Sequence, residues 1–289
     1  MTRSKLLTFY GLKWNPFTPD IPTEGLRCSP RLEHFGWRVE QLINEGGGFA
    51  LIRGEPGMGK SVALRILDER LSRIRDVLVG IVSRSQSGIS DFYRELGDLF
   101  GVNLRPHNRW GGFKILRERW KAHLESTLLR PVLLIDEAQS MSPTVLSELR
   151  VLSSDNFDAL CYLTVVLCGD DRLTGLFRHD DLIPLASRIR TRLVMEYASR
   201  EDLLTLIEHV TEQAGNARLL TKPLMQTLAE HAAGNYRMLM TMAGELLVEA
   251  MAREQTQLDE KLYLEVFQVP ATGGESKTKR RGGQRGAAR

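Results

Sequence analysis

The sequence predicts an α/β protein in which a parallel sheet is covered by helices on both faces, followed by a small all-helical domain. Three observations lead to this fold class. Short apolar runs recur along the first two thirds of the chain, helix-like segments separate them, and strand-like runs stop after Tyr197. With 289 residues, 42% of them hydrophobic, the chain can bury a sizeable core.

The apolar runs are nearly continuous rather than alternating, which is typical of strands covered on both faces in a parallel sheet. They lie at residues 49–52, 77–82, 132–135, 162–168 and 193–195. Helix-like segments fall between them, at residues 61–75, 89–100, 113–128 and 143–152. Strands that alternate with helices in this way predict a three-layer α/β/α domain.

The pattern changes at Ser199, which we expect to be a helix N-cap with Asp202 three residues later in a capping-box position. Further helices are expected at residues 222–233, 236–253 and 258–267. The chain is therefore expected to have four parts. They are an N-terminal segment packing on the α/β core (1–47), the α/β domain (48–198), a helical domain (199–270) and a basic tail (271–289).

Charge is distributed unevenly. The chain has a formal net charge of +3, but residues 271–289 carry six basic residues and one acidic residue, so the rest of the chain is slightly acidic. We expect this tail to be disordered and either to hold nucleic acid or to be a solvated end. No apolar run approaches the ~20 residues that span a bilayer, and the N-terminus has no secretory signal pattern. The three cysteines lack metal-ligand spacing, so free thiols and a cytoplasmic location are expected.

One loop matches the pattern G-x-x-x-x-G-K-[ST] in full and lies between a predicted strand and a predicted helix. Its residues, with the one that follows, are Gly54, Glu55, Pro56, Gly57, Met58, Gly59, Lys60, Ser61 and Val62. The glycines allow backbone N–H groups to approach phosphate closely. Lys60 is expected to contact the β- and γ-phosphates, and Ser61 to bind Mg²⁺. The loop predicts ATP binding.

A second candidate lies at the end of the run 132–135, where Asp136 and Glu137 follow directly. The carboxyl ends of parallel strands form the edge at which ligands of open α/β sheets bind. We expect Asp136 to hold Mg²⁺ and Glu137 to orient the attacking water. Together with the loop at 54–61, they predict ATP hydrolysis.

The combination of motifs resembles AAA+ ATPases, which have the P-loop NTPase fold with a helical lid domain. More narrowly it is similar to the ExeA/TniB/TnsC-like group. The likeness covers roughly residues 9–255. Besides the P-loop, it is carried by the segments Tyr10-Gly-Leu-Lys-Trp-Asn-Pro-Phe-Thr-Pro-Asp20, Gly48-Phe-Ala-Leu-Ile-Arg-Gly54, Asp136-Glu-Ala-Gln139, Val165-Val-Leu-Cys-Gly-Asp170, Leu185-Ala-Ser-Arg-Ile-Arg190 and Gly234-Asn-Tyr-Arg237.

The resemblance implies further roles. Asp170 falls at the sensor-1 position, although it could instead be a turn former. Arg188 falls where a trans-acting arginine finger is expected, with Arg190 and Arg192 as rivals. Arg237 resembles the lid residue that senses the γ-phosphate. Phe17 would lie beside adenine, or else form a hydrophobic staple.

A trans-acting arginine implies self-association into a ring or helical filament. Basic residues between the second and third strands, and one at the end of the second, could then follow the backbone of double-stranded DNA without reading its sequence. These candidate DNA contacts are Arg84, Arg105, Arg109, Lys114 and Lys121. The other interpretation is a solvated amphipathic helix.

Two functions remain open. The first is an ATP-dependent oligomer on DNA that regulates transposition, recruits a transposase and selects the target. The alternative, implied by the ExeA likeness, is an ATPase that energises assembly of a bacterial secretion apparatus. The first is preferred because no membrane-spanning run follows the helical domain.

Overall fold

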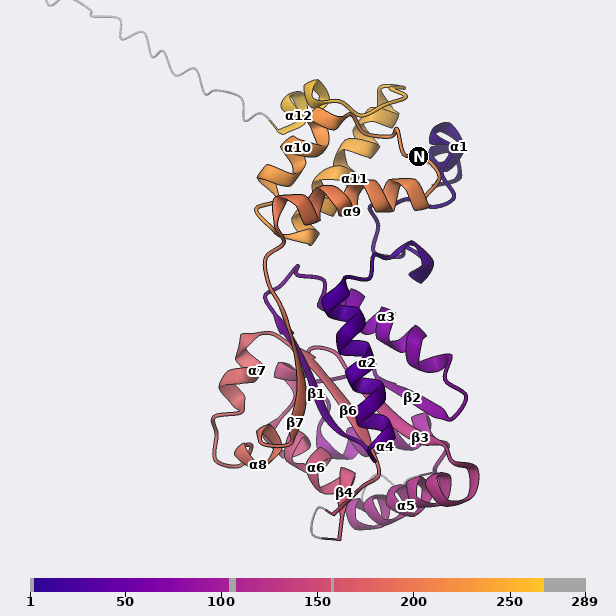
Figure 1. The fold of residues 1–289 in the computed structure, drawn as a ribbon, viewed down its shortest axis with the longest axis vertical. Helices are drawn as coiled ribbons and strands as arrows, with labels where there is room; N and C mark the ends of the chain where they lie inside the picture. The colour runs from indigo at the N-terminus through magenta and orange to yellow at the C-terminus, as the bar shows by residue number, and fades with distance from the viewer. Residues whose placement is uncertain (1–2, 104–107, 157–158, 268–289) are drawn as a thin grey trace, which may run out of the picture.

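A computed structural model describes residues 3–103, 108–156 and 159–267. The chain forms an α/β unit and a separate helical unit (Figure 1). The predicted basic tail and Arg105 lie outside the described residues.

In the described part of the chain, five parallel strands form the main sheet, in the order β2-β3-β6-β1-β7. The strands are β1 (Gly48–Gly54), β2 (Val77–Val82), β3 (Arg130–Ile135), β6 (Thr164–Gly169) and β7 (Ile189–Met195). A short antiparallel pair, β4 (Ser154–Asp155) and β5 (Leu160–Cys161), precedes β6. The predicted parallel sheet is confirmed.

The last strand is longer than the predicted run at 193–195. β7 is an edge strand whose residues alternate between buried (Ile189, Thr191, Leu193) and exposed (Arg190, Arg192). Because one face of this strand meets solvent, its first half carries arginines and has no continuous apolar run.

Alternate residues of the inner strands pack on opposite faces of the sheet. Ala50, Val132 and Val166 face a cluster formed with α2 (Pro30–Asn44) and α3 (Lys60–Ser72). Phe49 and Leu133 face the opposite cluster, formed with the remaining helices of the unit. These helices are α4 (Ile89–Phe100), α5 (Arg109–Ala122), α6 (Pro143–Ser153), α7 (Asp171–Leu176) and α8 (Ile183–Ala186). The sheet is thus the middle of three layers.

The helix expected at 113–128 differs at both ends. It begins at Arg109 because the Asn108 side chain caps it, accepting a hydrogen bond from the Gly111 N–H at 2.8 Å. After Ala122 it passes into a π-helical turn, η2 (His123–Thr127), which ends at Leu128 in the left-handed region with φ 56°. Two 3₁₀ turns, η1 (Thr23–Gly25) and η3 (Ala138–Ser140), complete the α/β unit.

The helical unit contains α9 (Arg200–Gln213), α10 (Lys222–His231), α11 (Tyr236–Ala252) and α12 (Glu260–Phe267). Ser199 caps α9 as predicted, with its hydroxyl accepting from the Asp202 N–H at 3.1 Å. The unit encloses its own apolar core.

The N-terminal segment, expected to pack on the α/β core, divides between the two units. α1 (Arg3–Tyr10) and the residues after it bury Leu6, Tyr10 and Phe17 in the core of the helical unit, and Figure 1 shows α1 beside α9 and α11. Only α2 packs on the sheet. Apolar side chains of the first part are therefore buried among the helices of the helical unit.

Candidate nucleotide-binding site

The P-loop connects the end of β1 to the start of α3, at the carboxyl edge of the sheet. Gly57 and Gly59 have φ of 88° and 87°, a region that side chains with a Cβ rarely adopt. Gly59 is the N-cap of α3, so the loop leads the backbone N–H groups of the first helical turn toward one point. This is the geometry that binds phosphate.

Lys60, the first residue of α3, is only 7% exposed. Its Nζ donates a hydrogen bond to the Glu55 carbonyl oxygen at 3.2 Å, across the loop. Ser61 follows and is exposed. A buried ammonium inside a loop of backbone donors gives the site a concentrated positive charge for an anionic ligand.

Asp136 and Glu137 follow β3, and a single strand, β6, separates β3 from β1. The two carboxylates and the P-loop therefore share the carboxyl edge, as predicted. The Glu137 N–H donates to Asp136 Oδ1 at 2.8 Å, and Glu137 has φ 51°. Such a conformation costs on the order of 1–3 kcal/mol for a residue other than glycine, and strain of this kind concentrates at functional sites.

Gln139 connects Glu137 to the end of β6. Its Nε2 donates to Glu137 Oε2 at 2.5 Å, and its Oε1 accepts from the Asp170 N–H at 3.3 Å. The amide thus fixes the orientation of the Glu137 carboxylate relative to the adjacent strand.

Asp170 caps α7 by accepting from the Arg172 N–H at 3.0 Å. Its carboxylate also accepts from the Arg172 guanidinium, from Nε at 3.1 and 2.9 Å and from Nη2 at 2.7 Å. These bonds hold the pKa of the Asp170 carboxyl below its usual value. Asp170 is therefore a helix cap, in line with the turn-forming alternative, and it lies at the site as an ion pair rather than as a lone acid.

Cys168 lies near the end of β6 and is fully buried on the α3 side of the sheet. Burial, and next the charge of the Asp136 carboxylate, raise the pKa of its thiol. Cys168 therefore stays protonated and lies beside Asp136 as a neutral neighbour.

The residues present fit a hard divalent cation bound together with phosphate. Mg²⁺ prefers oxygen ligands and is usually held by one or two carboxylates together with substrate phosphates and water. Ser61 and Asp136 supply a hydroxyl and a carboxylate at the same edge. No cluster of three or more acidic, His or Cys ligands occurs in the described ranges.

The helical unit contacts the P-loop directly through the first turn of α11. Asn235 Nδ2 donates to the Pro56 carbonyl, and the Arg237 N–H donates to the Gly57 carbonyl, each at 3.2 Å. The Asn235 Oδ1 also caps α11 by accepting from the Met238 N–H at 3.1 Å. The backbone of Arg237, the predicted γ-phosphate sensor, thus contacts the P-loop, and the residue is exposed.

Arg188 lies at the opposite end of the sheet from the P-loop. It precedes β7, whose residue Ile189 pairs with Phe49 at the start of β1, whereas Met195 pairs with Gly54 at the end. At ~3.3 Å per residue, roughly 17 Å of strand separates the two ends. Arg188 donates to the Pro184 carbonyl. Its rivals also have partners within the chain, Glu45 for Arg190 at 3.8 Å and the Ala186 carbonyl for Arg192 at 3.4 Å.

Most of the candidate DNA contacts are engaged in ion pairs. Arg109 donates to both oxygens of Glu148, whose side chain is only 6% exposed, so a phosphate contact by Arg109 would have to break this pair. Lys114 pairs with Glu118 of α5 at 3.8 Å, and Lys121 pairs with Glu125 of η2 at 3.9 Å. Arg84 is exposed and shares a pocket with Glu137.

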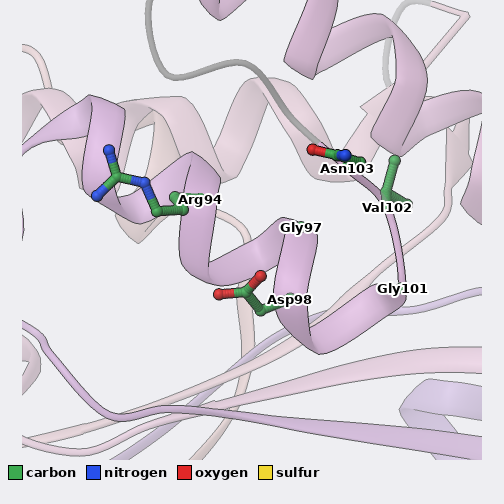
Figure 2. Close-up of a pocket in the computed structure, with 6 residues that line it drawn as sticks. All are labelled: Arg94, Gly97, Asp98, Gly101, Val102 and Asn103. Atoms are coloured by element: carbon green, nitrogen blue, oxygen red, sulfur yellow. The ribbon is translucent and has the colours of Figure 1, made fainter.

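The last predicted contact, Phe17, is buried in the core of the helical unit and packs against Gly244 of α11. This burial favours packing over a contact with adenine. The depression in Figure 2 lies at the end of α4, around Asp98 and Gly101, and contains no predicted site residue. The P-loop offers backbone N–H groups at an open edge of the sheet. The candidate nucleotide site is therefore identified by the conformation of this loop and not by the volume of a pocket.

Gln139 and Asn235 lie in segments that carry the family resemblance, but neither they nor Arg172 were predicted as site residues. Asn235 could have been found from its place before a helix, since Asn is a favoured N-cap. The positions of Gln139 and Arg172 depend on β6 lying between β3 and β1, which is a fact of strand order and leaves no local signal.

The comparisons agree with this geometry. Residues 43–177 match the family model described as AAA domain. General secretion pathway protein A from Aeromonas hydrophila is 29% identical over 249 residues; these cover 85% of this chain but 45% of that protein, so the chain spans less than half of this relative.

Solved structures show the same fold. The ADP form of ORC2 from Aeropyrum pernix superposes with a TM-score of 0.70 and 14% identity, over 86% of this chain and 70% of that one. ORC1 from Aeropyrum pernix, in complex with DNA, gives a TM-score of 0.64 and 18% identity, over 86% and 67%. Residues 43–177 are therefore similar to AAA domains, and the chain shares with these solved structures an α/β fold that is followed by helices.

Proposed function

We propose that this chain is a self-associating ATPase module that energises assembly of a bacterial secretion apparatus. The similarity to general secretion pathway protein A carries this proposal, since it extends over 85% of the chain and through both units. It favours the secretion alternative over the transposition regulator preferred from the sequence. In the ranges 3–103, 108–156 and 159–267, no helix has the length and apolar character needed to cross a bilayer.

The proposed chemistry uses the residues at the carboxyl edge. The P-loop N–H groups and Lys60 hold the β- and γ-phosphates, and Glu137, fixed by Gln139, accepts a hydrogen bond from the attacking water and orients it. Ser61 and Asp136 would hold Mg²⁺, which neutralises charge on the phosphates when bound. Arg237 extends from the lid toward the γ-phosphate.

Arg188 supports completion of the site by a second copy. It lies one strand length away from its own P-loop, so its guanidinium would reach a γ-phosphate only in a neighbouring subunit. A head-to-tail contact of this kind forms a ring or a helical filament. Because the arginine would contact ATP and not ADP, hydrolysis would weaken the assembly.

The secretion proposal is tested by removing the gene from its host and restoring it as wild type or as Glu137→Gln. The secreted proteins are then quantified by mass spectrometry, with total cellular protein as control. We expect the deletion and the variant to lose the same set of secreted proteins. Unchanged secretion in the deletion strain would exclude the proposal.

A second candidate function is ATP-dependent binding of double-stranded DNA, by which the chain would regulate a transposase. The fold similarity to ORC1, whose structure contains DNA, and the exposed Arg84 at the carboxyl edge favour it. Electron microscopy with duplex DNA and a non-hydrolysable ATP analogue tests it. DNA-coating oligomers that disappear in Arg84→Ala support this function, and no DNA association at low salt rejects it.

A further inference from the structure

Arg172 lies in the first turn of α7 and points its guanidinium back to the end of β6. Its Nε and Nη2 donate to the Asp170 carboxylate. The Asp170 side chain is 11% exposed, whereas that of Arg172 is 74% exposed. The acid is thus the buried anchor, and the arginine is held in one orientation while it remains open to solvent.

This orientation lies between the two halves of the nucleotide site. β6 separates the P-loop strand β1 from β3, and the Asp170 N–H is tied through Gln139 to Glu137. The hydrogen bonds between Asp170 and Arg172 are the main reason that the pKa of the Asp170 carboxyl is lowered and the pKa of Arg172 is raised, and the charges of Lys60 and Glu137, respectively, add to these shifts. All four charges therefore belong to one cluster at the carboxyl edge.

Arg172 neutralises the largely buried Asp170 carboxylate, with which it forms a bidentate pair. The cation does so from the first turn of a helix, where the partial positive charge of the backbone disfavours it. Neutralisation accounts for the side of the guanidinium that faces Asp170, and the other side remains available to a ligand.

The guanidinium also has donors to spare. Arginine has five N–H groups, and the pair with Asp170 uses the Nε and Nη2 side. Within residues 3–103, 108–156 and 159–267, Nη1 of Arg172 donates no hydrogen bond. A planar fork fixed on one side by a carboxylate is pre-organised to bind a second anion on the other side, and phosphate oxygens match its geometry.

We propose that Arg172 is a γ-phosphate contact acting in its own subunit, presented by Asp170 and aligned with Glu137 through Gln139. The inference rests on the proposed ATPase site and adds to it a cation distinct from Arg188 of a neighbour. It also gives the sensor position a positive partner for phosphate, which the Asp170 carboxylate alone would repel.

Binding of ADP and of adenylyl imidodiphosphate, both with Mg²⁺, tests this without turnover. Arg172→Ala should weaken binding of the triphosphate analogue about tenfold, the effect of one charge-assisted hydrogen bond. ADP binding should change less than twofold, and Arg172→Lys should recover part of the loss. Arg178→Ala removes an exposed charge just after α7 and should change neither affinity. An equal loss for both nucleotides, or no loss, overturns the proposal.

A second pair of variants separates phosphate contact from mere neutralisation of Asp170. In an Asp170→Asn background the amide oxygen can still accept a hydrogen bond from Arg172 and orient it, so Arg172→Ala should still weaken binding of the analogue several-fold. If its effect vanishes there, Arg172 only balances the acid and the proposal fails. Since only binding is measured, this result is independent of the proposed hydrolysis, which fails instead if the wild-type protein binds nucleotide but does not turn it over.

Discussion

Replacing Gly57 with alanine tests whether the helical unit docks on the P-loop as the structure has it. Gly57 has φ 88°, and an added Cβ would fall far inside the contact distance of the Asn235 amide. The left-handed conformation costs an alanine roughly 1–2 kcal/mol. Displacing Asn235 also removes its hydrogen bond to the Pro56 carbonyl, worth ~1 kcal/mol.

We therefore expect Gly57→Ala to destabilise the phosphate-binding conformation of the P-loop by about 2–3 kcal/mol. In a calorimetric titration this should appear as an affinity for ADP that is weaker by at least about tenfold. Gly175→Ala is the matched control, since Gly175 lies in α7 with no positive φ and no atom within 4 Å of an added Cβ. It should bind ADP as the wild type does.

The two contributions separate in a double variant. In an Asn235→Ala background the contact with the amide is gone, so Gly57→Ala should cost only the backbone part, about 1–2 kcal/mol. Strict additivity of the two single effects would refute the docking contact, because residues that do not touch behave independently.

Two further predictions concern stability. Glu148 is buried and accepts hydrogen bonds from the Tyr93 hydroxyl and from Arg109, so Glu148→Ala should lower the free energy of unfolding, measured in urea, by about 1–3 kcal/mol. The control Glu118→Ala removes an exposed ion pair on α5 and should change this free energy by less than about 0.5 kcal/mol. Equal effects of the two variants would contradict the prediction. Asp155 accepts from Tyr162 at 2.8 Å, and this bond, together with further hydrogen bonds to its carboxylate, lowers its pKa to about 2. Its depressed pKa adds stability that is present above pH ~4 and is lost as pH falls toward 2. The stability difference between wild type and Asp155→Asn should shrink over that window, and a difference independent of pH would reject the pairing.

Much of the fold could be predicted because its signals are local. The buried inner strands β1, β3 and β6 show as continuous apolar runs, and the P-loop and the Ser199 cap have fixed residue patterns. The start of β7 has no such signal, since its exposed face carries arginines. The placement of Phe17 also depends on the helical unit, far away along the sequence.

The candidate site, like the fold, was predictable only where its residues have a local sequence signal. Lys60, Asp136 and Glu137 were predicted as a group because parallel strands bring their carboxyl ends to one edge. The contacts made by Asn235 and Gln139 require the spatial order of β6 and the docking of α11, which the sequence alone does not determine.

We propose that the P-loop of one subunit is completed by the arginine of another, and mixing two inactive variants tests this most directly. Lys60→Ala removes the phosphate contact and Arg188→Ala removes the finger, so each alone should lack ATP turnover. In an equal mixture, roughly one quarter of head-to-tail contacts join an intact P-loop to an intact arginine, and ATPase activity should recover to about that fraction of the wild type. Mixed oligomers that stay inactive, or full turnover by Arg188→Ala alone, would contradict the claim.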